Sequence, residues 1–164
     1  MPGEFRPEEI LRVLEKHGVQ YVVIGGIAAT LHGSPHVTTD VDITPERGRK
    51  NLERLSAGLT ELNARIRVEG EPGGFKFNQN ADSLGWMEVF NLITDWGALD
   101  LSFTPAGTRG YEDLRRDAVD IEVLGVHTTV ASLADVVRSK EAAGRPKDLL
   151  VLPTLRRLLE EQRS

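Results

Sequence analysis

The sequence holds two aspartates separated by a single residue, Asp40 and Asp42, within the short run Thr38 to Ile43. This run contains several β-branched residues and is expected to form a strand, in which alternate side chains share a face. The two carboxylates would then lie side by side and repel each other unless a cation lies between them. Carboxylate oxygens of this kind suit Mg²⁺. The run therefore predicts a divalent-metal site, and the alternative is a pair of solvent-facing acids at the end of an edge strand.

Two glycines, Gly25 and Gly26, follow a short apolar run from Tyr21 to Ile24 and precede a segment of helical character over residues 27–32. Because glycine has no side chain, main-chain N–H groups at such a turn can approach a phosphate, and the helix N-terminus adds a favourable partial charge. The glycine pair is expected to bind phosphate. The alternative is a tight strand-to-helix turn without a ligand.

A third carboxylate, Asp100, stands in an apolar run that ends at Phe103. Leu99, Leu101 and Phe103 share one face of the expected strand. Asp100 and Ser102 therefore lie on the other face. A carboxylate in this position can complete a metal site and accept the proton of an attacking hydroxyl. The alternative is a solvent-facing residue of an edge strand.

Taken together, Ile24-Gly25-Gly26, Asp40-Val41-Asp42-Ile43 and Leu99-Asp100-Leu101 resemble the signature of the DNA polymerase β-like nucleotidyltransferase superfamily. The resemblance implies the nucleotidyltransferase fold, an α/β (α+β) arrangement with a mixed β-sheet, helices packed mainly on one face, and C-terminal helices. It also implies that the three aspartates hold Mg²⁺, or Mn²⁺ in its place, while a hydroxyl attacks the α-phosphate of an NTP and pyrophosphate leaves. Many members have Gly-Ser where this chain has Gly25-Gly26, so the phosphate contact of that serine hydroxyl is missing here.

The segment from Ser132 to Leu149 is similar to the Lys…Arg-x-Lys/Arg-Asp pattern of the AbiEii and MenT group of prokaryotic nucleotidyltransferase-like toxins. By that resemblance Lys140 binds the triphosphate of the nucleotide and Asp148 orders the site, so both join the three aspartates as expected catalytic residues. On physical grounds alone, Lys140 can equally be a solvated cation near a helix C-terminus. Asp148 can be an acid favoured by the dipole at a helix start.

The nucleotide-binding set that the resemblance implies comprises Gly25, Gly26, Thr39 and Lys140, with Thr39 directly before the first aspartate. In the same group Arg often stands where this chain has His36. This departure leaves open which side chain meets phosphate at that position.

These features predict an Mg²⁺-dependent nucleotidyltransferase that moves an NMP from Mg-NTP to a hydroxyl of an acceptor, which can be a tRNA, a protein or a small molecule such as an aminoglycoside. The resemblance adds the role of toxin in a toxin–antitoxin system, with a cognate antitoxin as partner. The alternative function is a catalytically silent module of the same fold that binds nucleotide or an antitoxin partner. A glycosyltransferase with an Asp-x-Asp metal site is disfavoured, because the glycine pair lies too near the aspartates.

The elements that position these residues follow from hydrophobic periodicity and turn residues. Helices are expected over residues 7–17, 27–32, 45–62, 111–116, 132–143 and 146–161. Strands are expected over residues 21–24, 38–43, 65–69, 87–93, 98–103, 120–124 and 126–130. A turn is expected over 71–74, and a loop or weak strand over 75–85.

Three local signals refine these elements. Ser132 with Asp135 three residues later resembles a capping box at a helix start. Pro153 is expected to kink or divide the last helix. Trp86 and Trp96 are interpreted as core or hairpin residues.

Composition limits the other possibilities. With 164 residues, 40% of them hydrophobic and 27% charged, the chain is expected to form one domain over residues 1–164. It contains no cysteine, which excludes thiolate metal sites and a thiol nucleophile. The first 18 residues lack an uninterrupted apolar stretch, and no run approaches the roughly 18 apolar residues of a membrane span. We therefore expect a cytoplasmic protein without a membrane partner.

The charge of the chain is acidic but uneven. The formal net charge of −5 argues against a large surface for sequence-independent binding of nucleic acid, because such a surface is basic. Residues 138–164, however, carry seven Lys or Arg against four acids. An acidic body that gathers metal beside a basic C-terminal segment suits a phosphate-bearing ligand.

Overall fold

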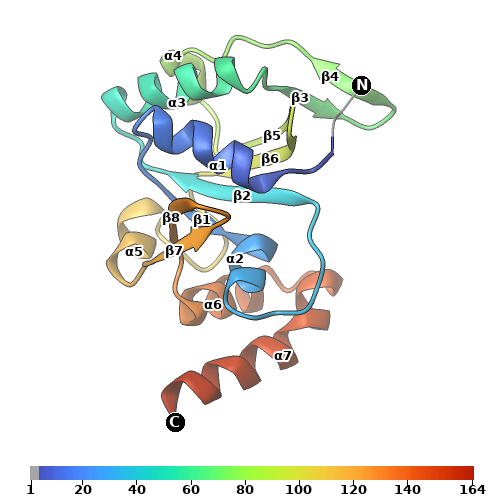
Figure 1. Cartoon of the computed structure of the whole chain (residues 1–164), viewed down its shortest axis with the longest axis vertical. Helices are drawn as coiled ribbons and strands as arrows, with labels where there is room; N and C mark the ends of the chain where they lie inside the picture. Colours follow the sequence, from blue (N-terminus) through green and yellow to red (C-terminus); the bar gives the residue numbers. More distant parts are fainter. Residues whose placement is uncertain (1–3) are drawn as a thin grey trace.

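The computed structural model describes residues 4–164, which are built around one eight-stranded sheet (Figure 1). The helices are α1 (Pro7–Lys16), α2 (Gly25–Leu31), α3 (Arg49–Glu61), α4 (Ala81–Leu84), α5 (Tyr111–Arg116), α6 (Leu133–Ala143) and α7 (Pro146–Arg163). The strands are β1 (Tyr21–Ile24), β2 (Asp40–Pro45), β3 (Arg65–Val68), β4 (Glu71–Phe75), β5 (Val89–Thr94), β6 (Gly97–Ser102), β7 (Val119–Val123) and β8 (Val126–Val130).

The strand order of the sheet is β4-β3-β5-β6-β2-β1-β8-β7. β2 pairs in parallel with β6 and antiparallel with β1, and β1 pairs in parallel with β8. The remaining neighbours pair antiparallel, among them the β5–β6 hairpin expected around Trp96-Gly97. The predicted fold, a mixed sheet with C-terminal helices, is therefore confirmed.

The two faces of the central strands have different surroundings. Val41 and Ile43 of β2 are fully buried and alternate with the two aspartates of that strand. On their side, α1 lies against β2, β6 and β8, and α3 packs beside α1. The other face is covered only in part, because Leu114 of α5 and Val136 of α6 border a cavity there. The sheet thus separates a buried apolar layer from an open face that carries the aspartates.

The break between α6 and α7 has a clear local cause. The Ser132 hydroxyl accepts a hydrogen bond from the Asp135 N–H at 3.1 Å, which caps the start of α6 as predicted. Gly144 ends α6 in the left-handed conformation, with φ of 61°. Pro146 then occupies the first turn of α7, where its missing N–H leaves no bond unmade. This short turn brings the basic residues of both helix ends to the same side of the sheet.

The boundaries around the aspartate strand differ from the prediction. β2 runs from Asp40 to Pro45 instead of over 38–43, and the helix expected to begin at Pro45 begins at Arg49. Pro45 lies opposite Tyr21 at the end of β2, a place in a strand that tolerates the missing N–H of proline.

The segment after β3 contains more regular structure than expected. The predicted turn over 71–74 is strand β4, because the hairpin turn lies earlier, at Gly70 with φ of 84°. The predicted loop or weak strand over 75–85 contains the short helix α4. Asn80 caps this helix, since its side chain accepts a hydrogen bond from the Ser83 N–H at 2.9 Å.

Two interpretations of single residues need correction. Of the two outcomes expected at Pro153, a kink or a division of the last helix, the division does not occur, because α7 is one continuous helix. Pro153 is exposed, so the carbonyl that loses its N–H partner can be hydrated. Trp86 is 85% exposed and does not belong to the core. Trp96, in contrast, lies at the β5–β6 turn, packs against the core and faces the guanidinium of Arg6, whose Cζ is 5.4 Å from the ring centroid.

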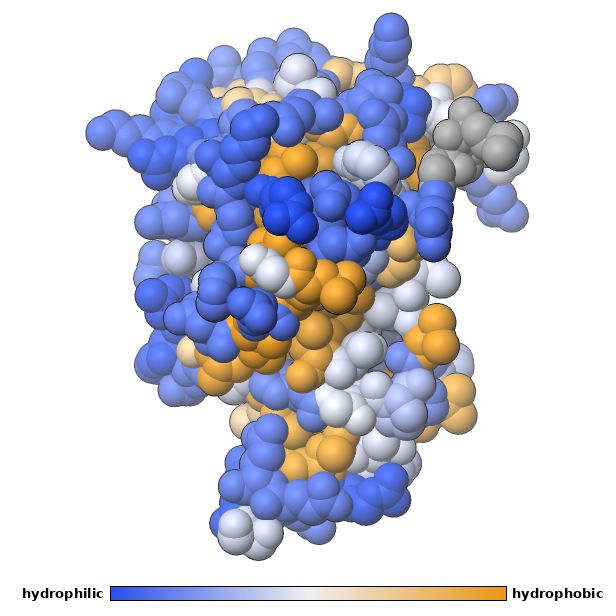
Figure 2. Space-filling model, viewed as in Figure 1, coloured by the Kyte–Doolittle hydropathy of each residue, from blue (hydrophilic) through white to orange (hydrophobic). Residues whose placement is uncertain are grey.

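The surface is mainly hydrophilic in the upper part of the view in Figure 2, and apolar side chains appear lower down, including on α7. Leu149 and Leu150 at the start of that helix are exposed. Across residues 4–164, none of the helices combines the length and the apolar character needed to cross a membrane.

Candidate active site

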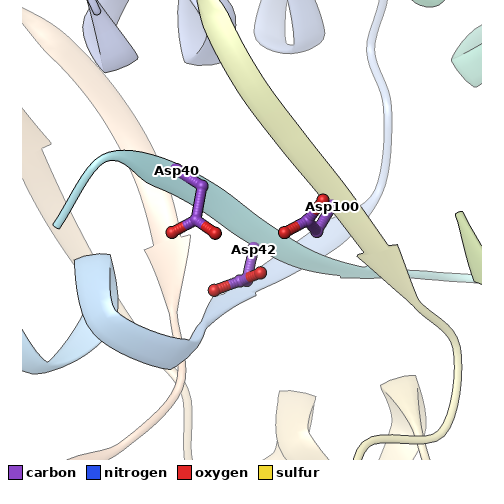
Figure 3. A group of neighbouring side chains, drawn as sticks. All are labelled: Asp40, Asp42 and Asp100. Carbon is purple, nitrogen blue, oxygen red and sulfur yellow. The ribbon is translucent and has the colours of Figure 1, made fainter. Parts of the chain in front are cut away.

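The three predicted aspartates converge on one point of the open sheet face. β2 carries Asp40 and Asp42, and the parallel neighbour β6 places Asp100 directly beside Asp42 in the strand register. One carboxylate oxygen of each residue lies within 4.8 Å of the others, and Figure 3 shows the three side chains gathered there. The Thr38 hydroxyl donates to Asp40 Oδ1 at 3.2 Å and helps to orient it. The structure therefore brings together the residues that sequence spacing placed on two strands.

This proximity changes the proton affinity of the carboxyl groups. Burial, followed by the charges of Asp40 and Asp100, raises the pKa of Asp42 to about 7. Burial also raises the pKa of Asp100, against the opposing effect of Arg67. A cation that binds between these carboxyl groups would favour their ionised form and so lower the raised pKa values.

The raised pKa of Asp42 predicts a pH dependence of stability in the metal-free protein. Its pKa lies above the ordinary value of 3.8, so the folded state binds the proton more tightly than the unfolded state. The contribution of Asp42 to the free energy of unfolding should therefore fall as pH rises from about 4 to about 7. Urea titrations in chelator at pH 4.5 and pH 7.5 measure this change.

The matched variant for this measurement is Asp42→Asn, which cannot ionise. The decline between the two pH values should be smaller in Asp42→Asn than in the wild type, and saturating Mg²⁺ should reduce it in the wild type. Equal declines in both proteins would contradict the assignment of the raised pKa to this carboxyl group.

The glycine pair lies against the aspartates. Instead of forming a turn ahead of a helix that begins at residue 27, Gly25 and Gly26 are the first two residues of α2, and Ile24 is the N-cap. Gly25 has φ of +69°, and a Cβ atom there would overlap the Asp42 carboxylate, 3.0 Å from its Cγ. A Cβ atom on Gly26 would lie 3.0 Å from the Thr38 hydroxyl. Glycine is therefore required at the first of these positions both by backbone conformation and by the close approach of Asp42.

Two connected hollows lie over the triad. The larger, of about 480 Å³, is lined by Asp40, Asp42 and Asp100 and extends towards β3, α5 and α6. The smaller, of about 290 Å³, lies over the start of α2, next to the loop before β2. Both are bordered by Gly25 and by the same cationic residues, Lys140, Arg145 and Lys147. The site therefore combines a cluster of acids with a cluster of bases, as a metal–phosphate ligand requires.

Asp148 organises the cationic side of the site without reaching the cavity. It is fully buried, and its Oδ2 accepts hydrogen bonds from the Nε and main-chain N of Arg145 at 2.7 Å and 3.2 Å. Lys140 Nζ lies 3.5 Å from its Oδ1. Burial alone would raise the pKa of Asp148, but the hydrogen bonds and charge of Arg145 outweigh it and lower that pKa. Asp148 is thus placed to position the two cations, whereas Lys140 itself borders both hollows.

The residues at the triad fit a divalent cation. They offer hard carboxylate oxygens from two adjacent strands, the donor type that Mg²⁺ and Mn²⁺ take. Asp100 Oδ1 is buried and has no hydrogen-bond partner among residues 4–164. The cation nearest to this oxygen is the Arg67 guanidinium, whose Nη1 lies 2.9 Å away, so the oxygen already interacts with positive charge.

One further predicted residue, Thr39, and one position whose role the sequence left open, His36, lie at the smaller hollow. Thr39 is exposed and lines it, and so does His36, at the position where Arg often stands in the group that the sequence resembles. Three cations at the site were not among the predicted residues. Arg145 and Lys147 could have been found from their spacing relative to Lys140. Arg67 has no local signal, because only the pairing of β3 with β5 brings it near Asp100.

Comparisons with known proteins define the class of fold. No protein-family model matches the chain, and no curated protein matches its sequence. Solved structures do match over nearly the whole chain, and they are nucleotidyltransferases. Because their sequence identities are below 20%, the likeness shows the nucleotidyltransferase fold.

Three of these structures are informative. The lincosamide antibiotic adenylyltransferase LnuA, solved with lincomycin bound, has a TM-score of 0.61 and 17% identity, covering 93% of this chain and 95% of its own. ANT(2″)-Ia in complex with adenylyl-2″-tobramycin has a TM-score of 0.60 and 15% identity, with coverage of 96% and 89%. TM1012 of Thermotoga maritima, a proposed nucleotidyltransferase, has a TM-score of 0.54 and 19% identity, with 96% coverage of both chains.

Proposed function

We propose that this protein is a nucleotidyltransferase that moves an NMP from an NTP to a hydroxyl group of an acceptor. The observation that carries the proposal is the convergence of Asp40, Asp42 and Asp100 beside the glycine start of α2 and a cation-lined hollow. Two of the similar structures support the same reaction class, because one is described as an adenylyltransferase and the other contains an adenylylated antibiotic.

The three carboxylates are the groups that would hold a divalent ion, Mg²⁺ or Mn²⁺. When bound, such an ion stabilises charge on the α-phosphate and lowers the pKa of an attacking hydroxyl. The hydroxyl oxygen attacks the α-phosphorus, the bond from that phosphorus to its bridging oxygen breaks, and pyrophosphate leaves. In this proposal Asp100, which lines the larger hollow, accepts the proton that the hydroxyl loses.

The cations of α6, of α7 and of the turn between them are assigned to the triphosphate. Lys140 and Arg145, held by the buried Asp148, border both hollows together with Lys147. Their charge offsets the negative charge of the triphosphate and of the departing pyrophosphate. Thr39 and the main chain at Gly25 and Gly26 line the same wall of the smaller hollow.

Substitution of Lys140 by Ala should therefore weaken nucleotide binding. Loss of one charge-assisted contact to phosphate is expected to raise the Kd for a non-hydrolysable NTP analogue about 10–100-fold. Calorimetry in Mg²⁺ measures this change. Lys16→Ala serves as the control, because Lys16 pairs with Glu61 on the far elements α1 and α3, outside both hollows. A Kd for Lys140→Ala equal to that of the control would remove Lys140 from the nucleotide site.

The acceptor is to be found by transfer assays with each NTP labelled at its α-phosphate. The three arms contain hydroxyl-bearing small molecules, total RNA and total protein. The antibiotic substrates named for LnuA and ANT(2″)-Ia support the first arm, and the Lys140-to-Asp148 segment, with its likeness to the toxin group, supports the RNA and protein arms. Label transfer that requires Mg²⁺ and intact aspartates supports the enzyme. NTP binding without transfer in any arm would favour a silent binding module.

The toxin role, with a cognate antitoxin as partner, is a narrower proposal that rests on that segment alone. Arrest of bacterial growth on expression of the wild type, but not of the Asp42→Asn variant, supports it. Equal growth with both proteins would contradict it.

A further inference from the structure

Arg67 of β3 extends across β5 to the third aspartate of the triad. Its Nη1 atom lies 2.9 Å from Asp100 Oδ1. The Arg67 side chain is 37% exposed and that of Asp100 is 15% exposed, so the contact lies at the inner wall of the larger hollow. Among the ion pairs of residues 4–164, this is the one that includes a carboxylate of the triad.

The contact is an ion pair in which the same Arg67 nitrogen also serves a main-chain acceptor. Arg67 Nη1 donates its hydrogen bond to the main-chain oxygen of Leu92 at 3.0 Å. Asp100 Oδ1, although close to the same nitrogen, has no hydrogen-bond partner among the described residues. The ion pair therefore holds Asp100 Oδ1 by charge, and the guanidinium offsets part of the negative charge of the cluster.

The other cations of the site form their ion pairs outside the triad. Arg145 and Lys140 are tied to Asp148, a carboxylate outside the triad. Within the described part of the chain, Arg67 is the cation paired with a residue that a divalent ion would bind. A guanidinium and a metal ion on the same carboxylate group repel each other at such short distances. Metal binding to Asp100 and the Arg67 ion pair therefore compete.

We propose that Arg67 is a built-in counter-cation, which occupies Asp100 in the metal-free protein and must move away for the divalent ion to bind. The proposal rests on the metal-binding triad of the proposed function. Its consequence is that the ion binds weakly by itself and enters together with the NTP, whose phosphates add ligands and negative charge. Arg67 thus acts as a positioning residue that couples metal uptake to nucleotide.

The test is Mn²⁺ binding in the absence of nucleotide, followed by electron paramagnetic resonance of the free ion. Arg67→Gln should lower the Kd for Mn²⁺ about tenfold. Arg67→Lys keeps the charge and should bind Mn²⁺ much like the wild type. Arg65→Gln is the matched control, since Arg65 lies on the same strand but pairs at 3.9 Å with Asp95, outside the triad. The Arg65→Gln substitution should change the Kd for Mn²⁺ less than twofold, because the charge it removes is distant and screened by salt.

A double-mutant cycle tests whether Arg67 affects Mn²⁺ binding through Asp100. In an Asp100→Asn background, Arg67→Gln should leave the Kd for Mn²⁺ unchanged, because the competition has no carboxylate left to act on. An unchanged or higher Kd in Arg67→Gln alone would overturn the competition. If the wild type takes up Mn²⁺ only with NTP and Arg67→Gln does the same, the competition is overturned while the metal site stands. If no Mn²⁺ binds even with NTP, the proposed function fails as well.

Discussion

Replacement of Asp42 by Asn is expected to reduce nucleotidyl transfer by about 10²–10³-fold or more, because it removes a charged ligand that acts on the transition state. Asp42 lies between the other two members of the triad in the sheet, because it shares β2 with Asp40 and pairs in register with Asp100. The loss should appear in kcat, with a smaller change in the Kd for the nucleotide, which the cations of α6 and α7 retain. Transfer of α-labelled NMP measures both.

The same variant should gain stability in the absence of metal. With the ionised Asp42 removed at pH 8, the free energy of unfolding should rise by about 2 kcal/mol, or roughly 4–8 °C in Tm. This opposite movement of activity and stability excludes misfolding as the cause of lost transfer. Asp117→Asn, an exposed carboxylate outside both hollows, is the control and should change neither quantity. Full activity in Asp42→Asn would contradict the assigned role.

Substitution of Gly25 by Ala should lower transfer by about 10²-fold, since displacement of a reacting group by about 1 Å has effects of that size. The new methyl group would overlap the Asp42 carboxylate and push it away from Asp40 and Asp100. The left-handed backbone conformation at this residue adds about 1–2 kcal/mol of destabilisation for any L-residue with a side chain. Steady-state transfer rates and urea unfolding measure the two effects.

Gly125→Ala separates these effects. Gly125 has φ of +86° in the β7–β8 turn, and a Cβ atom there would meet nothing within 4 Å. Both variants therefore carry the backbone penalty, but only Gly25→Ala carries the clash with the carboxylate. Gly125→Ala should lose a similar amount of stability and keep its transfer rate. Equal transfer rates in the two variants would show that the approach of Gly25 to Asp42 is unimportant for the reaction.

The parts of the fold that sequence reasoning predicted are those with strong local patterns. In the two strands that carry the triad, apolar residues flank each aspartate, and this alternation assigns the aspartates to one face. Ser132 and Gly144 mark the ends of α6 by their capping chemistry. These signals depend on a few neighbouring residues, so they are readable without tertiary structure.

The errors have tertiary causes. Pro45 would suit a helix start, but pairing with Tyr21 keeps it in β2. The proline and glycines within residues 71–74 predict a turn, but pairing with β3 makes this segment a strand. Trp86 is large and apolar, and nothing in its local sequence shows that it is left exposed. In each case a long-range contact, or its absence, decides the structure.

The site shows the same division between local and long-range information. The predicted aspartates, Gly25 and Lys140 border one connected hollow. Asp148, predicted to order the site, lies behind it and reaches the ligand cavity only through the cations that it holds. Arg67 could not be predicted, because its role depends on three strands being neighbours: β3, β5 and β6.

The most direct measurement is a crystal structure with Mn²⁺ and a non-hydrolysable NTP analogue, in which anomalous scattering locates the metal. We predict Mn²⁺ bound by oxygens of Asp40, Asp42 and Asp100, with the triphosphate lying between Gly25 and Lys140. Anomalous peaks away from these three carboxylates, with the nucleotide bound elsewhere on the protein, would contradict the proposed site and the reaction assigned to it.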